Sequence, residues 1–278
     1  MPDGTVPAAD KRRSIPRVRK MGLSFRDVPR HWFYGNPLVT HTTNALNILF
    51  PAGERFFVRS VKHYLPQISD PVLLARVRAF FGQEGSHGHE HERAFEMLEA
   101  QGYEIRPWLQ WYERTAFELI EQRAPAKLRL SVTVALEHLT AALAEVALTQ
   151  SFLDHADPAM RDLLRWHAAE EIEHRSVAFD VLQQVDSRYS LRLLGMVVGL
   201  ACLMGFWRSA TAMLLEQEEG YTKADMRRDR KAAIDRGQDR KALMRSVLSY
   251  LRPGFHPDDS DTDELAREYL RSIGRLEG

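Results

Sequence analysis

Residues 80–95 read FFGQEGSHGHEHERAF, and three histidines and three glutamates fall within nine of these positions. The stretch belongs to a longer segment, residues 71–100, in which apolar residues recur at the spacing of one helix face. That apolar stripe consists of Leu74, Val77, Phe81, Phe95 and Leu98. The segment is therefore predicted to form one long helix whose apolar face carries the polar cluster in its middle.

Continuing the stripe from Phe81 to Phe95 leads to Glu84, then His87 or Gly88, then His91. These polar side chains consequently occupy core positions, where a carboxylate or imidazole is costly unless it is paired or bound to a metal. The other members of the cluster fall off the stripe and are expected to face water; they are His89, Glu90 and Glu92.

Residues 158–185 repeat this pattern, with His167, Glu171 and His174 on the apolar stripe. Glu170 and Glu173 lie beside the stripe, and we expect them to face solvent. Each of the two segments thus offers a Glu-x-x-His pair, which places both side chains on one helix face, one turn apart.

The pattern of the whole chain predicts an all-α fold, because helical periodicity recurs and strand signals are weak. Two helix pairs are expected, 51–66 with 71–100 and 127–154 with 158–185, and their short turns predict a four-helix bundle. A shorter helix is expected over about 107–122. We predict three parts: an irregular or short-helical segment at 1–49, the dimetal bundle at 50–187, and a helical extension at 188–278 that packs on the bundle.

A metal site in such a bundle also needs one carboxylate from each remaining helix. Glu54 shares a face with apolar residues of the first helix. In the third helix Glu137 and Glu145 compete, and depth decides between them, because ligands must lie equally far from the turn that joins their helices. Glu137 is 17 residues before Asp154 and Glu145 only 9, so we choose Glu137.

The predicted metal ligands are Glu54, Glu84, His87, Glu137, His167, Glu171 and His174. We place His91 as a hydrogen-bond partner behind the ligands, with an extra ligand as the alternative. The competing interpretation of the whole cluster is a buried salt-bridge network without metal.

This ligand pattern resembles that of the ferritin-like dimetal carboxylate superfamily. The additional histidine makes it similar to the arylamine N-oxygenases, whose di-iron site has three histidines and four glutamates; His91 is outside their pattern. The segments FPAGERFF, GQEGSHGHEH, WHAAEEIEHRSVAFDV and YLRPGFHP further resemble a bacterial family described as predicted metal-dependent hydrolases, over residues 20–270 or so.

Two divalent cations would balance four carboxylates, and oxygen and nitrogen ligands without thiolate suit iron first, with manganese or a mixed Mn/Fe pair as alternatives. By analogy with the resemblance, we expect a di-iron enzyme that activates O₂ to oxidise a small organic substrate by N-oxygenation or hydroxylation, with an electron donor. The alternative is a hydrolase that uses a metal-bridged hydroxide, with a glutamate or histidine outside the ligand set, such as His91, as a proton shuttle. Metal storage is disfavoured by the long C-terminal extension.

Composition limits the remaining functions. Equal numbers of basic and acidic residues, 38 each, give no reason to expect a nucleic-acid partner. The single cysteine, Cys202, excludes an intramolecular disulfide and a cysteine-built metal site. No apolar segment follows the charged N-terminus (Lys11, Arg12, Arg13), so we expect a cytoplasmic protein. Association as a homodimer is left open.

Residues 193–207, LLGMVVGLACLMGFW, carry no charge, yet fifteen residues are short of the roughly 20 that span a bilayer. We therefore expect a buried fifth helix over the bundle, which would line a pocket for a largely apolar substrate. The alternative is weak peripheral contact with a membrane. The basic segment 222–250 is expected to form solvated helix.

Overall fold

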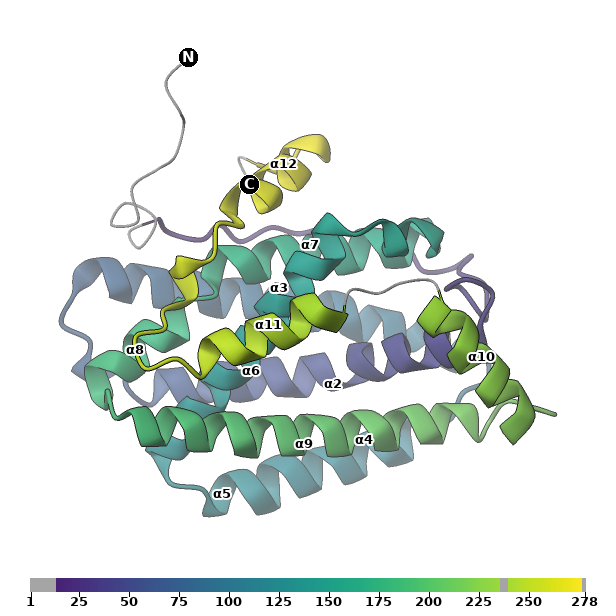
Figure 1. Cartoon of the computed structure of the whole chain (residues 1–278), viewed down its shortest axis with the longest axis horizontal. Helices are drawn as coiled ribbons and strands as arrows, with labels where there is room; N and C mark the ends of the chain where they lie inside the picture. The colour runs from purple at the N-terminus through teal and green to yellow at the C-terminus, as the bar shows by residue number, and fades with distance from the viewer. Residues whose placement is uncertain (1–13, 236–239, 277–278) are drawn as a thin grey trace.

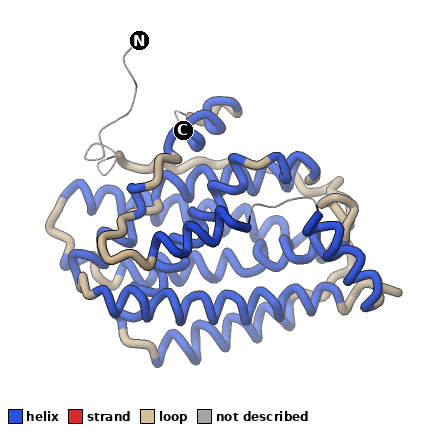
Figure 2. The backbone as a smooth tube through the Cα atoms, in the orientation of Figure 1, coloured by secondary structure: helices blue, strands red, loops and turns tan. Residues whose placement is uncertain are grey.

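The computed structural model describes residues 14–235 and 240–276. Helices make up nearly all of the regular structure in these ranges, and the described residues contain no β-strand, only one isolated bridge between Phe33 and Ala156 (Figure 2). The prediction of an all-α fold is confirmed. Lys11, Arg12 and Arg13, on which the expectation of no secretory leader rests, lie outside the described residues.

Four long helices supply the polar cluster: α2 (Pro37–Lys62), α3 (Pro71–Ala100), α6 (Ala126–Thr149) and α7 (Pro158–His174). Helix α2 packs against α3 and α6, and α7 packs against α6 and α3 (Figure 1). Helix α3 begins at Asp70, whose side chain accepts a hydrogen bond from the Val72 amide, and α7 begins in the same way at Asp157.

Two of the three connections between these helices are short, and each contains a 3₁₀ turn. Between α2 and α3 lies the 3₁₀ turn η1 (Leu65–Gln67), and between α6 and α7 the 3₁₀ turn η3 (Ser151–His155). The predicted helix at 107–122 consists of α4 (Arg106–Glu113), the π-helical η2 (Arg114–Ile120) and α5 (Glu121–Arg123).

The prediction that the first helix starts at Pro51 is wrong, because α2 begins fourteen residues earlier, at Pro37. The side chain of Asn36 accepts a hydrogen bond from the Val39 amide, and Pro37 occupies the first turn. Asn36 and Pro37 together are therefore a stronger helix start than Pro51 alone. Pro51 instead lies inside the helix, where it lacks the N–H that would bond one turn back. Residues 37–49, predicted to be irregular or short-helical, are therefore part of α2.

The predicted helix 158–185 is broken. Helix α7 ends at His174, and α8 (Val177–Val185) follows after a turn at Arg175 and Ser176. The buried Arg175 donates to the carbonyls of Pro257 and Ser260, which draws the C-terminal segment across this turn.

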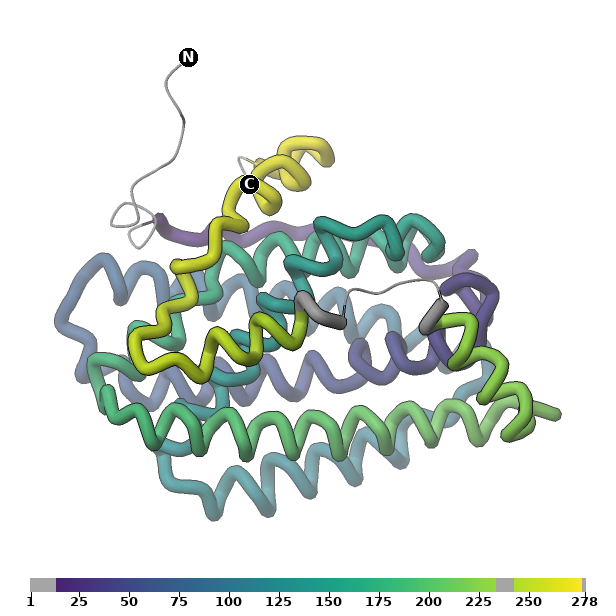
Figure 3. The backbone as a smooth tube through the Cα atoms, viewed as in Figure 1, coloured from purple at the N-terminus to yellow at the C-terminus, as the bar shows by residue number. Residues whose placement is uncertain are grey.

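The C-terminal helices pack on the outside of the four long helices. Helix α9 (Tyr189–Leu215) contacts α6 and α2, α10 (Lys223–Asp235) contacts α2, α11 (Arg240–Tyr250) contacts α6, and α12 (Asp263–Ser272) contacts α7. A 3₁₀ turn, η4 (Pro257–Asp259), precedes α12. Figure 3 shows that the axis of α9 lies roughly along the axes of the helices that it covers.

Helix α9 approaches α6 closely at Gly195, where a Cβ would lie 2.1 Å from Ser131 Oγ and 2.5 Å from its carbonyl oxygen. The opposite face of α9 is open to solvent: Leu194 and Val197 are 49% and 66% exposed. The expectation of a buried helix is therefore wrong for this face. Helix α9 has 27 residues and extends beyond the uncharged stretch 193–207 at both ends.

Among the described residues, α6 and α9 are long and apolar enough to span a membrane. Core helices of soluble proteins pass the same test, and α6 is mostly buried, so this observation is weak support for a membrane contact.

The apolar core forms two large clusters along the four long helices. One gathers around Phe57, Phe80 and Val181, and the other around Phe95, Leu163 and Trp166. The inward-facing polar side chains of α3, Glu84, His87 and His91, lie between Phe80 of one cluster and Phe95 of the other, and all three are buried.

Candidate metal centre

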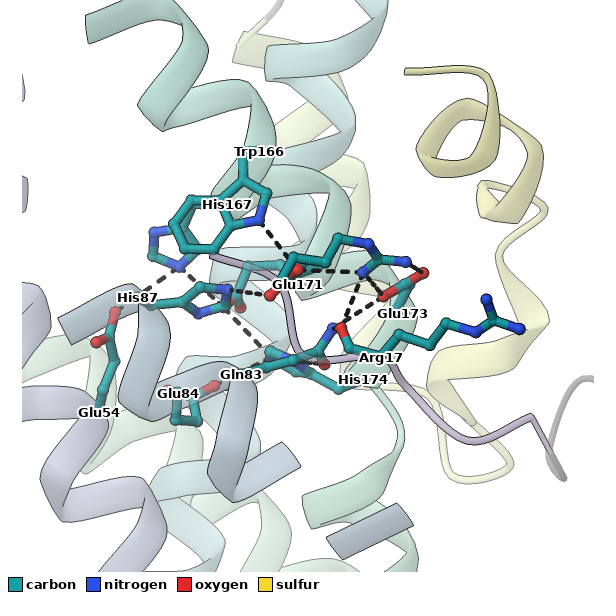
Figure 4. Close-up of polar contacts among 12 residues, drawn as sticks. Arg17, Glu54, Gln83, Glu84, His87, Trp166, His167, Glu171, Glu173 and His174 are labelled. Carbon is teal, nitrogen blue, oxygen red and sulfur yellow. Dashed lines mark hydrogen bonds and ion pairs between the residues drawn. The ribbon is translucent and has the colours of Figure 1, made fainter. Parts of the chain in front are cut away.

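Seven predicted ligands converge from four helices, and none of them is more than 4% exposed. Glu54 comes from α2, Glu84 and His87 from α3, Glu137 from α6, and the remaining three from α7. Figure 4 shows several of these side chains pointing toward one another between the helices. Glu145, the rejected alternative to Glu137, lines a different pocket beside Arg175.

Six of these side chains form two groups of three. In the first, ligand atoms of Glu54, His87 and His167 lie within 4.8 Å of one another, and in the second those of Glu84, Glu171 and His174 do. Glu137 adjoins the second group, because its Oε2 is 3.4 Å from His174 Nε2. Each group could hold one metal ion.

Glu171 joins the two groups. Its Oε1 is 2.9 Å from His167 Nε2, 3.3 Å from His174 Nε2 and 3.7 Å from His87 Nδ1. This one carboxylate oxygen thus lies within 4 Å of all three imidazoles of the centre. Glu171 is therefore the carboxylate that both groups could share if each held an ion.

Each of the three imidazoles is held by a partner on its outer nitrogen. His87 Nε2 is 3.1 Å from Glu170 Oε2. His174 Nδ1 is 3.0 Å from Gln83 Oε1, and Figure 4 labels both residues of this second pair. His167 Nδ1 is 2.6 Å from His91 Nε2. Partners of this kind fix the tautomer and orientation of metal-bound histidines.

Most inner atoms of the centre are unsatisfied; the exceptions are His167 Nε2 and Glu171 Oε1, which lie 2.9 Å apart. Buried atoms without a hydrogen-bond partner among the described residues include His87 Nδ1, His174 Nε2 and both carboxylate oxygens of Glu54, Glu84 and Glu137. Buried polar groups are otherwise almost always hydrogen-bonded. Orphaned donor atoms that face one another, with the outer nitrogens already held, fit metal binding better than a closed salt-bridge network.

The electrostatics of the centre point the same way. Burial and the nearby carboxylates of Glu84, Glu171 and Glu137 raise the pKa of Glu54 well above its ordinary value. Burial also disfavours the charged form of His174, but the carboxylates, Glu171 foremost, outweigh this effect and raise its pKa. Without cations some of these groups must keep protons, and metal ions would displace those protons.

Glu170 does not face solvent, so that expectation is wrong. It is fully buried, and besides His87 it accepts hydrogen bonds from Trp166 Nε1 at 3.0 Å and Arg19 Nη1 at 3.1 Å. Burial raises its pKa to about 7, although the Arg19 guanidinium lowers it. Arg19 also binds Glu173, which is half-buried.

The N-terminal segment explains these differences. Figure 3 shows the first described residues running along the outside of α7, where Arg19 meets Glu170. The same segment covers Glu90, whose Oε1 accepts from the Gly22 amide at 2.8 Å, so the expectation that Glu90 faces water is also wrong. His89 and Glu92 are exposed, as expected.

Two small residues that sequence reasoning did not assign shape the centre. A Cβ on Gly88 would lie 3.2 Å from Glu54 Oε2, so glycine lets α3 approach that carboxylate. Thr140 Oγ1 lies within hydrogen-bond distance of both Glu171 Oε2 and the Glu137 carbonyl, and its single proton is donated to one of them at a time. Gly88 was visible in the sequence as an alternative stripe position, whereas Thr140 lies one turn after Glu137 without any distinguishing pattern.

Two apolar cavities reach the centre from the side of α2 and α6. One, of about 140 Å³, lies between α2, η2, α6 and α9 and touches Glu54. The other, of about 240 Å³, touches His167 and Glu171. Phe50 and Thr140 line both cavities, which therefore meet beside the centre.

A further histidine–carboxylate group lies apart from the centre. His31 and His41 both face Glu218 Oε1, at 3.1 Å and 2.6 Å. The Arg30 guanidinium, 3.4 Å from the same oxygen, and the Tyr103 hydroxyl complete its contacts. Because Arg30 already neutralises the carboxylate, this group is an ion-pair network and a poor cation site.

Neither the curated proteins nor the solved structures searched contain a significant match to this chain. The family model described as "predicted metal-dependent hydrolase" matches residues 17–261. That range contains all seven converging side chains as well as Arg19, Gln83, His91 and Glu170. The chain therefore belongs to the family of predicted metal-dependent hydrolases.

Proposed function

We propose that the seven side chains hold two iron ions and that the protein is an oxidising enzyme. Four carboxylates with three neutral imidazoles balance two divalent cations. Oxygen and nitrogen ligands without thiolate suit iron, and manganese in one or both positions is the alternative. In this proposal the four long helices form a ferritin-like bundle around the pair.

Iron, when bound, would supply the electron transfer to O₂ that oxidation of an organic substrate requires. The chain's own residues hold the ions, exclude water and orient the ligands. Phe50 packs against the rings of His91 and His167, with ring centroids 4.9 Å and 4.7 Å away. Thr140 holds the outer oxygen of Glu171, so its Oε1 stays turned toward the histidines.

The observation that carries the oxidative proposal is the lining of the two cavities. Next to the centre they expose Leu46, Phe50 and Leu143, and Thr140 is the one polar side chain that both share. Such walls suit an apolar substrate that reacts at carbon or nitrogen. Among the described residues of their walls, the one carboxylic acid outside the ligand set is Glu121; Arg59 holds it at 2.7 Å, so it is a poor proton donor for a leaving group.

Metal-dependent hydrolysis is the second candidate, and the description of the family favours it. Two ions with a bridging carboxylate can also lower the pKa of a bound water. The proton shuttle expected for this reaction has no counterpart at His91, which is fully buried, contacts His167 and lines neither cavity.

The test is to load the purified protein with Fe(II) without oxygen, count the bound ions, and then admit O₂ while following its uptake and the visible spectrum. We expect two ions per chain, rapid O₂ uptake and a transient absorption band. The Glu171→Ala variant is the control, because it removes the ligand shared by both groups. No O₂ uptake by the iron-loaded protein, together with hydrolysis of nitrophenyl esters or phosphoesters, would establish the hydrolase instead.

A further inference from the structure

The cavity between α2, η2, α6 and α9 is a long apolar channel. Its walls on α6 extend from Leu128 to Leu143, and Leu128 and Thr140 are roughly 18 Å apart at the helical rise of 1.5 Å per residue. Phe56, Phe117 and Phe206 are among its lining residues, from three separate elements. The channel therefore runs along α6 from Leu128, near the start of that helix, to Glu54 at the metal centre.

Gly53 keeps the inner end of this channel open. It lies in the interior of α2, directly before Glu54, and a Cβ there would meet no atom within 4 Å. Neither packing nor a left-handed backbone requires glycine at this position, yet glycine weakens a helix interior relative to alanine. The empty volume beside Glu54 is consistent with a site that a ligand fills.

The outer end of the channel carries a cation. Arg129 lines it, and the Arg129 Nε is buried without a hydrogen-bond partner among the described residues. The nearby Glu121 is already bound by Arg59 at 2.7 Å and 3.1 Å and is 3.8 Å from Arg129. Two guanidinium groups thus face one carboxylate, which leaves one positive charge for an anionic group.

We propose that this channel binds an amphiphile, with its hydrocarbon chain along the apolar walls, its far part beside Glu54, and its anionic headgroup at Arg129. The inference rests on the proposed function, since it names the substrate class of the same centre. The second cavity fits this ligand less well, because its walls, as far as the structure describes them, contain no lysine or arginine. A free carboxylate and an anionic membrane lipid share this chemistry.

The first experiment titrates dodecanoate into the zinc-loaded protein by calorimetry and compares two leucine variants. Gly53 and Gly85 each stand beside a ligand glutamate inside a helix, and a Cβ would be unobstructed at both. Gly53 lines the channel, whereas Gly85 is exposed and lines neither cavity. We expect Gly53→Leu to abolish binding and Gly85→Leu to bind like the wild type, both with unchanged zinc content.

A plug remote from the ligands guards against indirect effects on the metal. Ala116 lines the opposite wall on η2, so Ala116→Phe should weaken dodecanoate binding at least about tenfold while zinc content and helicity stay unchanged. Dodecanoate affinity equal to that of the wild type in both Gly53→Leu and Ala116→Phe would overturn the proposal. It would also be overturned if the wild type bound neither dodecanoate nor vesicles that contain phosphatidylglycerol.

The headgroup is tested with Arg129→Gln and its conservative partner Arg129→Lys. Loss of one charge-assisted contact should cost dodecanoate about tenfold or more in affinity, leave dodecanol unaffected, and be partly restored by lysine. A parallel arm measures sedimentation with vesicles that contain phosphatidylglycerol, which distinguishes a lipid from a free acid. Equal affinity of wild type and Arg129→Gln for dodecanoate would refute the assignment of the headgroup.

Zinc cannot take part in redox chemistry, so these binding measurements do not depend on the oxidative reaction. Dodecanoate binding without O₂ uptake by the iron-loaded protein would retain the channel and refute the oxidase. O₂ uptake without binding of either amphiphile would refute the channel and retain the oxidase.

Discussion

Replacing Glu170 with glutamine tests whether the groups behind the histidines support the metal centre. The substitution keeps the length of the side chain and removes its charge. Glu170 Oε2 faces His87 Nε2 at 3.1 Å, and its Oε1 accepts from Trp166 and Arg19. An amide in this place makes the imidazole less basic and leaves the buried Arg19 with one carboxylate fewer.

Loss of such a partner typically lowers metal affinity by about 10- to 100-fold. At about 1.4 kcal/mol per tenfold change, this equals about 1.4–2.8 kcal/mol. We expect a value in the upper half of this range, because Glu170 is fully buried and water cannot replace its contact. The control is Glu173→Gln, since Glu173 also binds Arg19 but reaches a ligand only through Gln83.

The assay is competition for zinc against a chelator of known affinity, with the cobalt-substituted protein as a second readout. The Co(II) visible spectrum should change in Glu170→Gln and stay unchanged in Glu173→Gln, because it reports on ligand geometry and not on stability. If Glu170→Gln and Glu173→Gln lose the same zinc affinity and have the same Co(II) spectrum, Glu170 does not support His87. Its role would then be limited to binding Arg19.

Three further predictions concern stability. Gly195→Ala should destabilise the protein by about 1–3 kcal/mol, because the new Cβ meets the Ser131 backbone at 2.5 Å, whereas Gly205→Ala on the same helix meets nothing within 4 Å and should leave the denaturant midpoint unchanged or raise it. Hydrogen bonds from Tyr103 and His41 outweigh the effect of burial and lower the pKa of Glu218 to about 2, so its stabilising contribution is complete above about pH 4.5 and is lost as the pH falls toward 2. Allowing for solvent screening, the stability difference between wild type and Glu218→Gln should shrink by about 1 kcal/mol between pH 5 and pH 3; a constant difference would contradict this. Chelation should lower the melting temperature at neutral pH, and a metal-free protein with the same melting temperature would show that the cluster is stable without cations.

The seven converging side chains were visible in the sequence because they are polar at positions where the periodicity calls for apolar residues. The apolar stripe shows which face of a helix a residue occupies. The two Glu-x-x-His pairs lie equally far from the starts of their helices, so they are expected at the same height along the helix axes. Depth then separated Glu137 from Glu145, which the structure places in different pockets. Their roles as ligands stay predictions until metal is bound.

The groups behind the ligands could not be found in this way. Glu170 and Glu90 lie off the stripe, and their burial is due to the segment around Arg19 and Gly22, which is irregular and has no periodicity to interpret. The start of α2 was missed for a related reason. Asn36-Pro37 and Pro51 both suit a helix start, and only tertiary packing shows that the helix continues through the second proline.

The two groups of metal-binding atoms have a consequence for how the chain folds. Each takes its members from both halves of the sequence: His87 and Glu54 meet His167, and Glu84 meets Glu171 and His174. Neither the pair α2 and α3 nor the pair α6 and α7 contains all three members of a metal-binding group. The carboxylates of one pair also repel those of the other. Bound ions would thus act as cross-links between the halves, comparable to a disulfide in a protein with a single cysteine.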